Sequence, residues 1–311
     1  MTAEPDNIVI KSNIVYLKVG RRWYCFRATD KPLGEGAMGT VYRGWDAVSN
    51  EPVAIKRVKD KYASVPAIRE RARNESNLMF RHQNLVEMLG CCESMIPNGP
   101  IFIISKWVNG VNIDAFVKSN LNRLPQNIRT KRICELMYPV LDALSFIHSK
   151  GVVHLDIKPS NIMIENGRSV RLMDLGIAFI EKSESGGSST SSSLMGTPKY
   201  AAPEQFSQSQ QKVGLNPSTD IYEVGVTLYE LITGNNPFAG ATLQETLEKH
   251  KEGIIPRDKL IPDSIMDVIK KATSVNQASR YRSAAEMKKA LQDSFLETPK
   301  KFNFWGLIRS K

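Results

Sequence analysis

Apolar and polar residues alternate along the first third of the chain in the pattern typical of β-strands. Ile14 to Val19 alternate clearly, and after a turn at Gly20 the pattern continues into an aromatic run, so residues 8–26 are expected to form strands. Further apolar segments of strand length follow at residues 40–43, 52–58, 85–92 and 101–107. The first segment is therefore predicted to be rich in sheet.

One helical pattern interrupts these strands. It starts at Pro66, a favourable residue for a first helical turn, and it places Ile68, Ala72, Glu75 and Met79 on one face. We therefore expect one main helix in this segment.

After Gly110 the apolar spacing changes to the helical period. Residues 129–149 are amphipathic, residues 220–233 are almost wholly apolar, and two further helices are predicted at 263–273 and 283–295. A sheet-rich segment followed by a helix-rich one predicts an α+β protein of two lobes with a cleft between them.

Composition and charge limit the function classes. The chain has 311 residues, of which 41% are hydrophobic, and a net charge of +10. The basic residues are dispersed, so we expect affinity for anions such as ATP and no specific nucleic-acid partner. There is no run of membrane-spanning length and no signal-peptide pattern, so a cytoplasmic location is expected. The four cysteines lack zinc or redox spacing, which favours buried thiols.

Three glycines, Gly34, Gly36 and Gly39, lie between two predicted strands. Glycine allows close backbone approach and leaves N–H groups that can face phosphate oxygens. The next strand carries Lys56 among apolar residues, where a buried ammonium group requires an anion. Together they indicate a phosphate site.

Two glutamates on the following helix could pair with Lys56. Glu75 shares the apolar stripe, whereas Glu70 lies about 200° around the helix from Ile68. Glu75 is therefore the expected partner. The alternative is that Lys56 extends to solvent and Glu75 is solvated.

A short run of the chain holds His154, Asp156, Lys158 and Asn161. Asp156 can accept a hydroxyl proton while Lys158 stabilises a transferring phosphoryl group. Asp174 follows a predicted strand, and its carboxylate with the Asn161 amide oxygen is a suitable donor set for Mg²⁺. These groups indicate phosphoryl transfer.

With these motifs in order, residues 30–292 resemble Hanks-type serine/threonine protein kinases, most closely bacterial ones. Residues 174–176 and 202–204 match two further family motifs. The resemblance implies the bilobal protein kinase fold, with a small antiparallel β-sheet lobe carrying one main helix and a larger helical lobe. It also implies four regions: an N-terminal β-rich extension at 1–27, the small lobe at 28–108, the large lobe at 109–292 and a basic-aromatic tail at 293–311.

The resemblance also implies where ATP and Mg²⁺ bind. Asn161 and Asp174 would hold the metal, and Ser105, a small residue at the gatekeeper position, would leave room behind the adenine. The residues implied to contact ATP are Leu33, Gly34, Gly36, Gly39, Val41, Ala54, Lys56, Ser105, Lys106, Val108 and Met163.

Further roles follow from the same resemblance. Lys158 with Thr197 is typical of kinases that phosphorylate serine or threonine in proteins. Asp220 resembles the aspartate that braces the catalytic loop, and Arg280 resembles the arginine that pairs with Glu204.

The chain departs from the family pattern at three places. Leu155 replaces the arginine that pairs with an activation-loop phosphate, so the chain resembles the non-RD type, and its activity is expected not to need that phosphate. The gap from Glu75 to His82 is shorter than usual, which weakens the Glu75 assignment, whereas Leu175 in place of phenylalanine is a mild change.

Several alternatives stay open. The serines at 183–193 fit flexible filler as well as autophosphorylation sites, and the extension fits a structural layer or a docking element. The tail from Lys300 fits a peripheral membrane contact, a partner groove or packing on its own domain. A pseudokinase scaffold and a small-molecule kinase are the rival functions.

Overall fold

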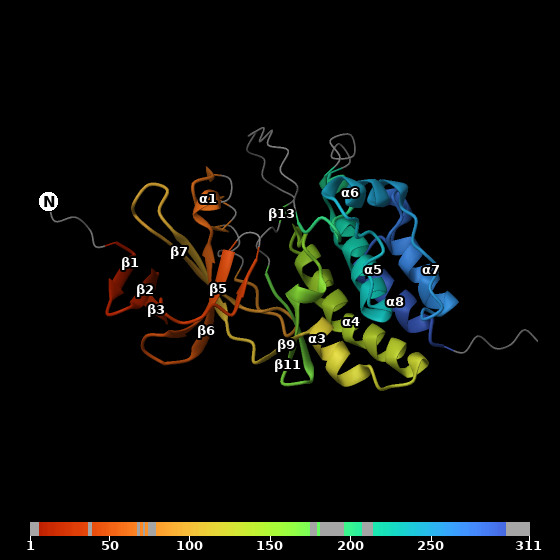
Figure 1. Cartoon of the computed structure of the whole chain (residues 1–311), viewed down its shortest axis with the longest axis horizontal. Helices are drawn as coiled ribbons and strands as arrows, with labels where there is room; N and C mark the ends of the chain where they lie inside the picture. Colours follow the sequence, from red (N-terminus) through yellow and green to blue (C-terminus); the bar gives the residue numbers. More distant parts are fainter. Residues whose placement is uncertain are drawn as a thin grey trace, which may run out of the picture.

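The computed structural model describes residues 6–36, 39–66, 69–70, 72–73, 79–174, 179–180, 196–206 and 214–296. These residues form two lobes, a strand-rich one from the N-terminal part of the chain and a helix-rich one from the C-terminal part (Figure 1). The predicted α+β, bilobal architecture is confirmed.

The small lobe is built on one antiparallel sheet in the order β1-β2-β3-β5-β6-β8-β7, with β4 paired to β5. Its strands are β1 (Ile8–Lys11), β2 (Ile14–Val19), β3 (Arg22–Arg27), β4 (Gly34–Glu35), β5 (Gly39–Asp46), β6 (Pro52–Val58), β7 (Met88–Glu93) and β8 (Ile101–Lys106).

The first three strands fold back toward the far edge of the same sheet. Asn7 Nδ2 donates to the Glu93 carbonyl oxygen at 3.2 Å, and Cys92 Sγ donates to the Asn7 carbonyl oxygen at 3.4 Å. Side chains of β2 and β3 share one apolar core with those of β6, β7 and β8: Val15, Leu17, Tyr24, Phe26, Val53, Ile55, Cys92, Phe102 and Ile104. The curled sheet is therefore one packed unit.

Strand register sets the positions of several predicted site residues. Val41 on β5 is opposite Lys56 on β6, and Ala54 on β6 is opposite Ser105 on β8. Because side chains alternate between the two faces of a strand, Ala54 and Lys56 share one face. The predicted strand at 52–58 coincides with β6.

The predicted helix after β6 is only partly described. A short helix, α1 (Asp60–Ala63), comes first, and Pro66 and residues 69–70 and 72–73 have helical backbone. Ala72 is buried as expected, but Met79 is 68% exposed and has no helical backbone. The prediction of Met79 on the buried stripe is therefore wrong, because the helical backbone does not extend to it.

The large lobe contains α3 (Ile113–Phe116), the π-helical turn η1 (Val117–Leu121), α4 (Gln126–His148), α5 (Pro217–Thr233), α6 (Leu243–Glu252), α7 (Asp263–Ala272) and α8 (Ala284–Asp293). Helices α4, α5, α7 and α8 enclose its apolar core. Helix α6 was not predicted. In the described part of the chain, no helix is long and apolar enough to cross a membrane.

The large lobe also contains short strands and 3₁₀ turns. They are β9 (Gly110–Asn112), β10 (Val152–Val153), β11 (Ile162–Glu165), β12 (Ser169–Leu172), β13 (Phe179–Ile180) and the 3₁₀ turns η2 (Pro159–Asn161), η3 (Pro203–Gln205) and η5 (Gln277–Ser279). Strands β9, β11 and β12 form one small sheet, and β10 pairs with β13.

Candidate active site

A cavity of about 580 Å³ lies between the lobes. Most residues predicted to contact a nucleotide line it, together with one predicted metal ligand: Leu33, Gly34, Val41, Ala54, Lys56, Ser105, Lys106, Val108, Met163 and Asp174. Lining residues that were not predicted include Met88, Ile103, Asn112, Ala115, Ser160 and Met173. The wall is largely apolar, with charged residues at Lys56, Lys106 and Asp174, which suits a flat apolar ring attached to a charged group.

The glycine hairpin between β4 and β5 closes one side of this cavity. Gly34 pairs with Val41, and the Gly36 N–H donates to the Gly39 carbonyl oxygen at 2.8 Å. A Cβ at Gly39 would lie 2.5 Å from the Arg57 carbonyl oxygen, so no side chain fits there. Gly36 and Gly39 are outside the cavity lining.

Lys56 and Asp174 connect the two lobes. Lys56 Nζ lies 2.6 Å and 2.8 Å from the two Asp174 carboxylate oxygens. Burial raises the pKa of Asp174, but the charge and hydrogen bonds of Lys56 outweigh it, with smaller effects of Lys158 and His154, so that the pKa is lowered. The carboxylate is ionised and faces the cavity. Glu75, the predicted partner of Lys56, lies outside the described residues.

Asp156 is the centre of a compact group of polar side chains. Its Oδ2 accepts from Lys158 Nζ at 2.6 Å and from Asn161 Nδ2 at 2.9 Å, and its Oδ1 accepts from Thr197 Oγ1 at 2.8 Å. Lys158 Nζ also donates to Thr197 Oγ1 at 2.6 Å. The four predicted residues lie together, and each group fixes the direction of the Asp156 carboxylate.

The loop that carries Asp156 is held from α5. Asp220 accepts the backbone N–H groups of His154 and Leu155 at 2.9 Å and 2.8 Å, as predicted for the brace. Leu155 has φ +66° and a fully buried side chain. A buried leucine cannot reach a phosphate, so this position offers no cation to the activation segment.

The segment behind the cavity joins the lobes. The backbone N–H of Lys106 donates to the Glu87 carbonyl oxygen at 2.9 Å, and Lys106 Nζ lies 2.7 Å from Glu87 Oε2. The guanidinium of Arg43 stacks over the Trp107 ring at 5.2 Å. These contacts fix the strand end at which the adenine is expected.

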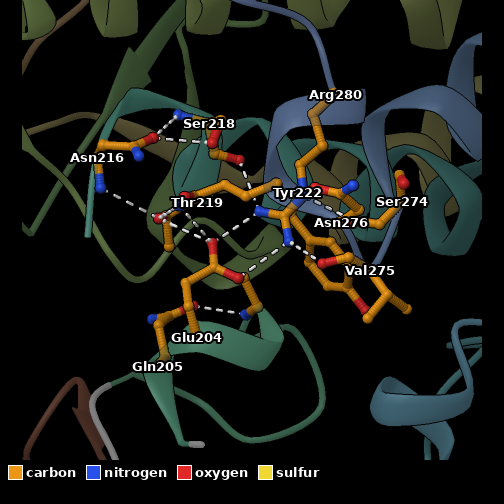
Figure 2. A network of polar contacts seen from close by, with 12 residues as sticks. Glu204, Gln205, Asn216, Ser218, Thr219, Tyr222, Ser274, Val275, Asn276 and Arg280 are labelled. Carbon is orange, nitrogen blue, oxygen red and sulfur yellow. Dashed lines mark hydrogen bonds and ion pairs between the residues drawn. The ribbon is translucent and has the colours of Figure 1, made fainter. Parts of the chain in front are cut away.

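A buried polar network supports the end of the activation segment (Figure 2). Arg280 makes two bonds to Glu204, with Nη1–Oε1 at 2.7 Å and Nη2–Oε2 at 2.9 Å, which confirms the predicted pair. Thr219 Oγ1 donates to Glu204 Oε1 at 2.9 Å, and Arg280 also donates to the carbonyl oxygens of Ser218 and Ser274. This network anchors η3 to α5.

Some predicted residues lie outside the described chain. They are Ile68, Glu75, Leu175, Gly176, the serine-rich residues 183–193 and the tail from Lys300. Beyond the cavity lining, two further residues of the site were missed: Gln205 and Glu223, which bond to the backbone of the catalytic loop. One signal for Glu223 was available in the sequence. It is a charged residue in a segment, 220–233, that was predicted to be an almost wholly apolar helix.

Comparison with known proteins agrees with this geometry. The family model described as protein kinase domain matches residues 27–296. Serine/threonine-protein kinase PknB of Mycolicibacterium smegmatis is 30% identical over 263 residues, covering 82% of this chain and 41% of the relative, and PknB of Mycobacterium tuberculosis has the same identity and coverage. Serine/threonine-protein kinase PrkC of Bacillus subtilis is 28% identical, covering 85% and 39%. The chain spans about two fifths of the length of these curated relatives.

Proposed function

We propose that this chain, which belongs to the protein kinase family, transfers the γ-phosphoryl group of Mg·ATP to serine and threonine hydroxyls of proteins, including its own. The observation that carries the proposal is the Asp156 group, in which one carboxylate is bonded by Thr197, Lys158 and Asn161 at 2.6–2.9 Å. The neighbouring cavity has the size and apolar lining that a nucleotide needs.

Asp156 acts as the general base in this proposal. Its carboxylate orients the acceptor hydroxyl and takes up the proton as the oxygen attacks phosphorus. Lys158, bonded to the same carboxylate, stabilises the negative charge of the transferring group. The 7% exposure of Asp156 keeps bulk water away from this proton transfer.

The donor groups fit a nucleotide with a divalent cation. The Asp174 carboxylate faces the cavity, and Asn161 uses its Nδ2 on Asp156, so its Oδ1 is left as an oxygen ligand. A cation held there would neutralise phosphate charge. Lys56 would bind the phosphates, and the backbone of Lys106 and Val108 would bind the adenine.

A serine or threonine acceptor is supported by two observations. Thr197 is bonded to both Asp156 and Lys158, so the part of the activation segment proposed to bind the acceptor peptide starts next to the base. The relatives that cover most of this chain are named serine/threonine-protein kinases.

The chain is further proposed to be of the non-RD type. The buried Leu155 side chain cannot form an ion pair with a phosphorylated activation segment. Catalytic-loop order would then come from Asp220 and its neighbours, so activity would not require that phosphate.

The direct test is phosphoryl transfer by the purified chain. We expect labelled ATP with Mg²⁺ to label serine or threonine in a generic acceptor or in the chain itself, with sites mapped by mass spectrometry. Asp174→Ala should abolish the label, and Lys131→Ala, on the surface of α4, should not. ATP binding without any transfer by the unaltered chain would refute the kinase proposal and favour a scaffold.

The non-RD proposal needs a separate measurement. A phosphatase-treated chain should phosphorylate an acceptor at an initial rate within about twofold of the untreated one. An initial rate lowered by an order of magnitude would contradict it.

A further inference from the structure

Three polar side chains on one face of α5 are fully buried: Asp220, Glu223 and Thr227. At 100° per residue they lie within an arc of about 60°. Buried polar groups require partners, so this face must meet polar atoms of another element.

That element is the catalytic loop. Asp220 accepts the first two N–H groups of the loop, as described above, and Glu223 Oε2 accepts the Ile157 N–H at 2.7 Å. Thr227 Oγ1 donates to the Ile157 carbonyl oxygen at 3.2 Å. The Asp156 N–H bonds to the His154 ring, at 3.3 Å from Nδ1. The four successive N–H groups of residues 154–157 thus all donate to side chains. Three of these N–H groups donate to side chains of α5, and the fourth donates to the His154 ring.

Glu223 acts on the peptide that follows the base. The peptide unit between Asp156 and Ile157 is held at both ends, its N–H by Glu223 and its carbonyl oxygen by Asn161 Nδ2 at 2.8 Å. Asn161 Nδ2 also bonds to the Asp156 carboxylate. A shift of this peptide would therefore move the base and the proposed metal ligand together.

The catalytic loop and Glu223 also lie against the end of the activation segment. Gln205 Nε2 donates to the Leu155 carbonyl oxygen at 3.1 Å. Gly196 has φ +90°, and a Cβ there would lie 2.7 Å from that carbonyl oxygen and 3.8 Å from Glu223 Oε1. The segment can close this tightly only because residue 196 has no side chain.

The charge state of Glu223 suits this place. Burial, the largest effect, and the negative charges of Asp220 and Asp156 raise the pKa of Glu223 well above its ordinary value, against the opposing bond from the Ile157 N–H and a smaller opposing effect of Gln205. A neutral carboxyl group can accept the Ile157 N–H without adding a negative charge beside the base.

We infer that Glu223 is a positioning residue for phosphoryl transfer, which fixes the peptide after Asp156 and couples it to Gly196 and Gln205 at the end of the activation segment. The inference rests on the proposed kinase activity. Glu223 orders the catalytic loop from α5, so the loop needs neither a phosphate on the activation segment nor a cationic side chain in place of Leu155.

The test compares three substitutions of this residue in the full chain. Glu223→Met keeps the length and volume but has no acceptor, so we expect kcat to fall about 10- to 100-fold, with the KM for ATP unchanged. Glu223→Gln keeps an oxygen acceptor and no charge, and should keep kcat within about threefold. Glu223→Asp shortens the arm and should lower kcat about 3- to 10-fold. Glu248→Gln, exposed on α6, is the matched control with unchanged kcat.

Each outcome decides the inference. A folded Glu223→Met chain with wild-type kcat overturns it, as does a Glu223→Gln chain as impaired as Glu223→Met. If Glu223→Met fails to fold, Glu223→Asp decides, because wild-type kcat there overturns the inference. A wild-type chain that transfers no phosphate overturns the proposed function together with the inference, whereas an active wild type with unaffected variants overturns the inference alone.

Discussion

Two ion pairs of similar length occupy different surroundings in this molecule. Lys56 and Asp174 meet at 2.6 Å in the cleft, with 22% and 30% of their side chains exposed. Arg280 and Glu204 meet at 2.7 Å inside the large lobe, with 0% and 3% exposed. In the first pair, Lys56 can bind phosphate and Asp174 can bind a metal ion instead of each other. In the second pair, separating the two side chains would leave an unpaired charge in the protein interior. We therefore expect the cleft to determine activity and the buried support to determine stability.

The largest expected effect separates activity from stability in the cleft. Asp156→Asn removes the base but keeps the side-chain shape and one oxygen acceptor, so we expect kcat to fall about 10²- to 10⁴-fold. The free energy of unfolding should change by less than about 1 kcal/mol. Steady-state kinetics and urea denaturation measure the two quantities, with Asp142→Asn on α4 as the control. If kcat stayed within about threefold of the wild-type value, the cleft would not differ from the buried pair in its effect on activity.

The buried support should show the opposite result. Arg280→Met leaves Glu204 without its cation in a buried place, and we expect a loss of about 3–5 kcal/mol in the free energy of unfolding. ATP affinity of the chain that remains folded should not change. Arg257→Met, which breaks an exposed pair with Asp263, should leave the urea midpoint unchanged. Equal effects of the two arginine substitutions would contradict the assignment.

Acid should destabilise the large lobe through His250, whose ring contacts Tyr222 of α5. The His250 ring is buried, Tyr222 Oη lies 2.7 Å from Nδ1, and burial, the largest effect, lowers the pKa to about 4 against a smaller opposing effect of the Pro198 and Lys199 backbone. Because the unfolded chain binds a proton near pH 6.5 and the folded chain does not, stability is lost as the pH falls from about 6.5 to 4.

The size of that loss is about 3 kcal/mol for one group with this pKa difference. Urea denaturation of His250→Gln across this pH range should show a correspondingly smaller pH dependence than that of the wild-type chain. An unchanged slope for His250→Gln would show that His250 does not titrate in this way.

The smallest stability effect is expected at the cleft pair. Lys56→Met should change the free energy of unfolding by less than about 1 kcal/mol, since solvent shares in the pair. ATP should bind about tenfold more weakly, because one charge-assisted contact to phosphate is lost. Nucleotide titration measures the affinity, and Lys61→Met is the exposed control. If Lys56→Met destabilised the chain as much as Arg280→Met, the two ion pairs would contribute equally to stability and the comparison would fail.

The fold was predictable where the local pattern was strong. Strand β6 matches its predicted bounds because Pro52 to Val58 is a largely apolar run of strand length. Helix α6 was missed because its sequence is mostly polar. Its boundary signals were present, since Thr242 Oγ1 accepts the Glu245 N–H and the helix ends at Gly253 with φ +67°.

The site was predictable from its motifs but not from its long-range partners. Motif spacing found Asp156, Lys158 and Asn161, which lie within a few residues of each other. Glu223 is 66 positions away from Ile157, and no local pattern tells which carboxyl group will face which N–H. Likewise, Lys56 and Asp174 are 118 positions apart, so their contact needed the arrangement of the two lobes.

The curled sheet of the small lobe has a consequence for synthesis of the chain on the ribosome. Strands β1 to β3 are translated before β7, and Asn7 bonds to Glu93, which is 86 positions later. At 5–20 residues per second, Asn7 waits roughly 4–17 s for that partner. During this interval Val15, Leu17, Tyr24 and Phe26 lack part of their cover. The nascent lobe is therefore most exposed to aggregation before residue 93 has been translated.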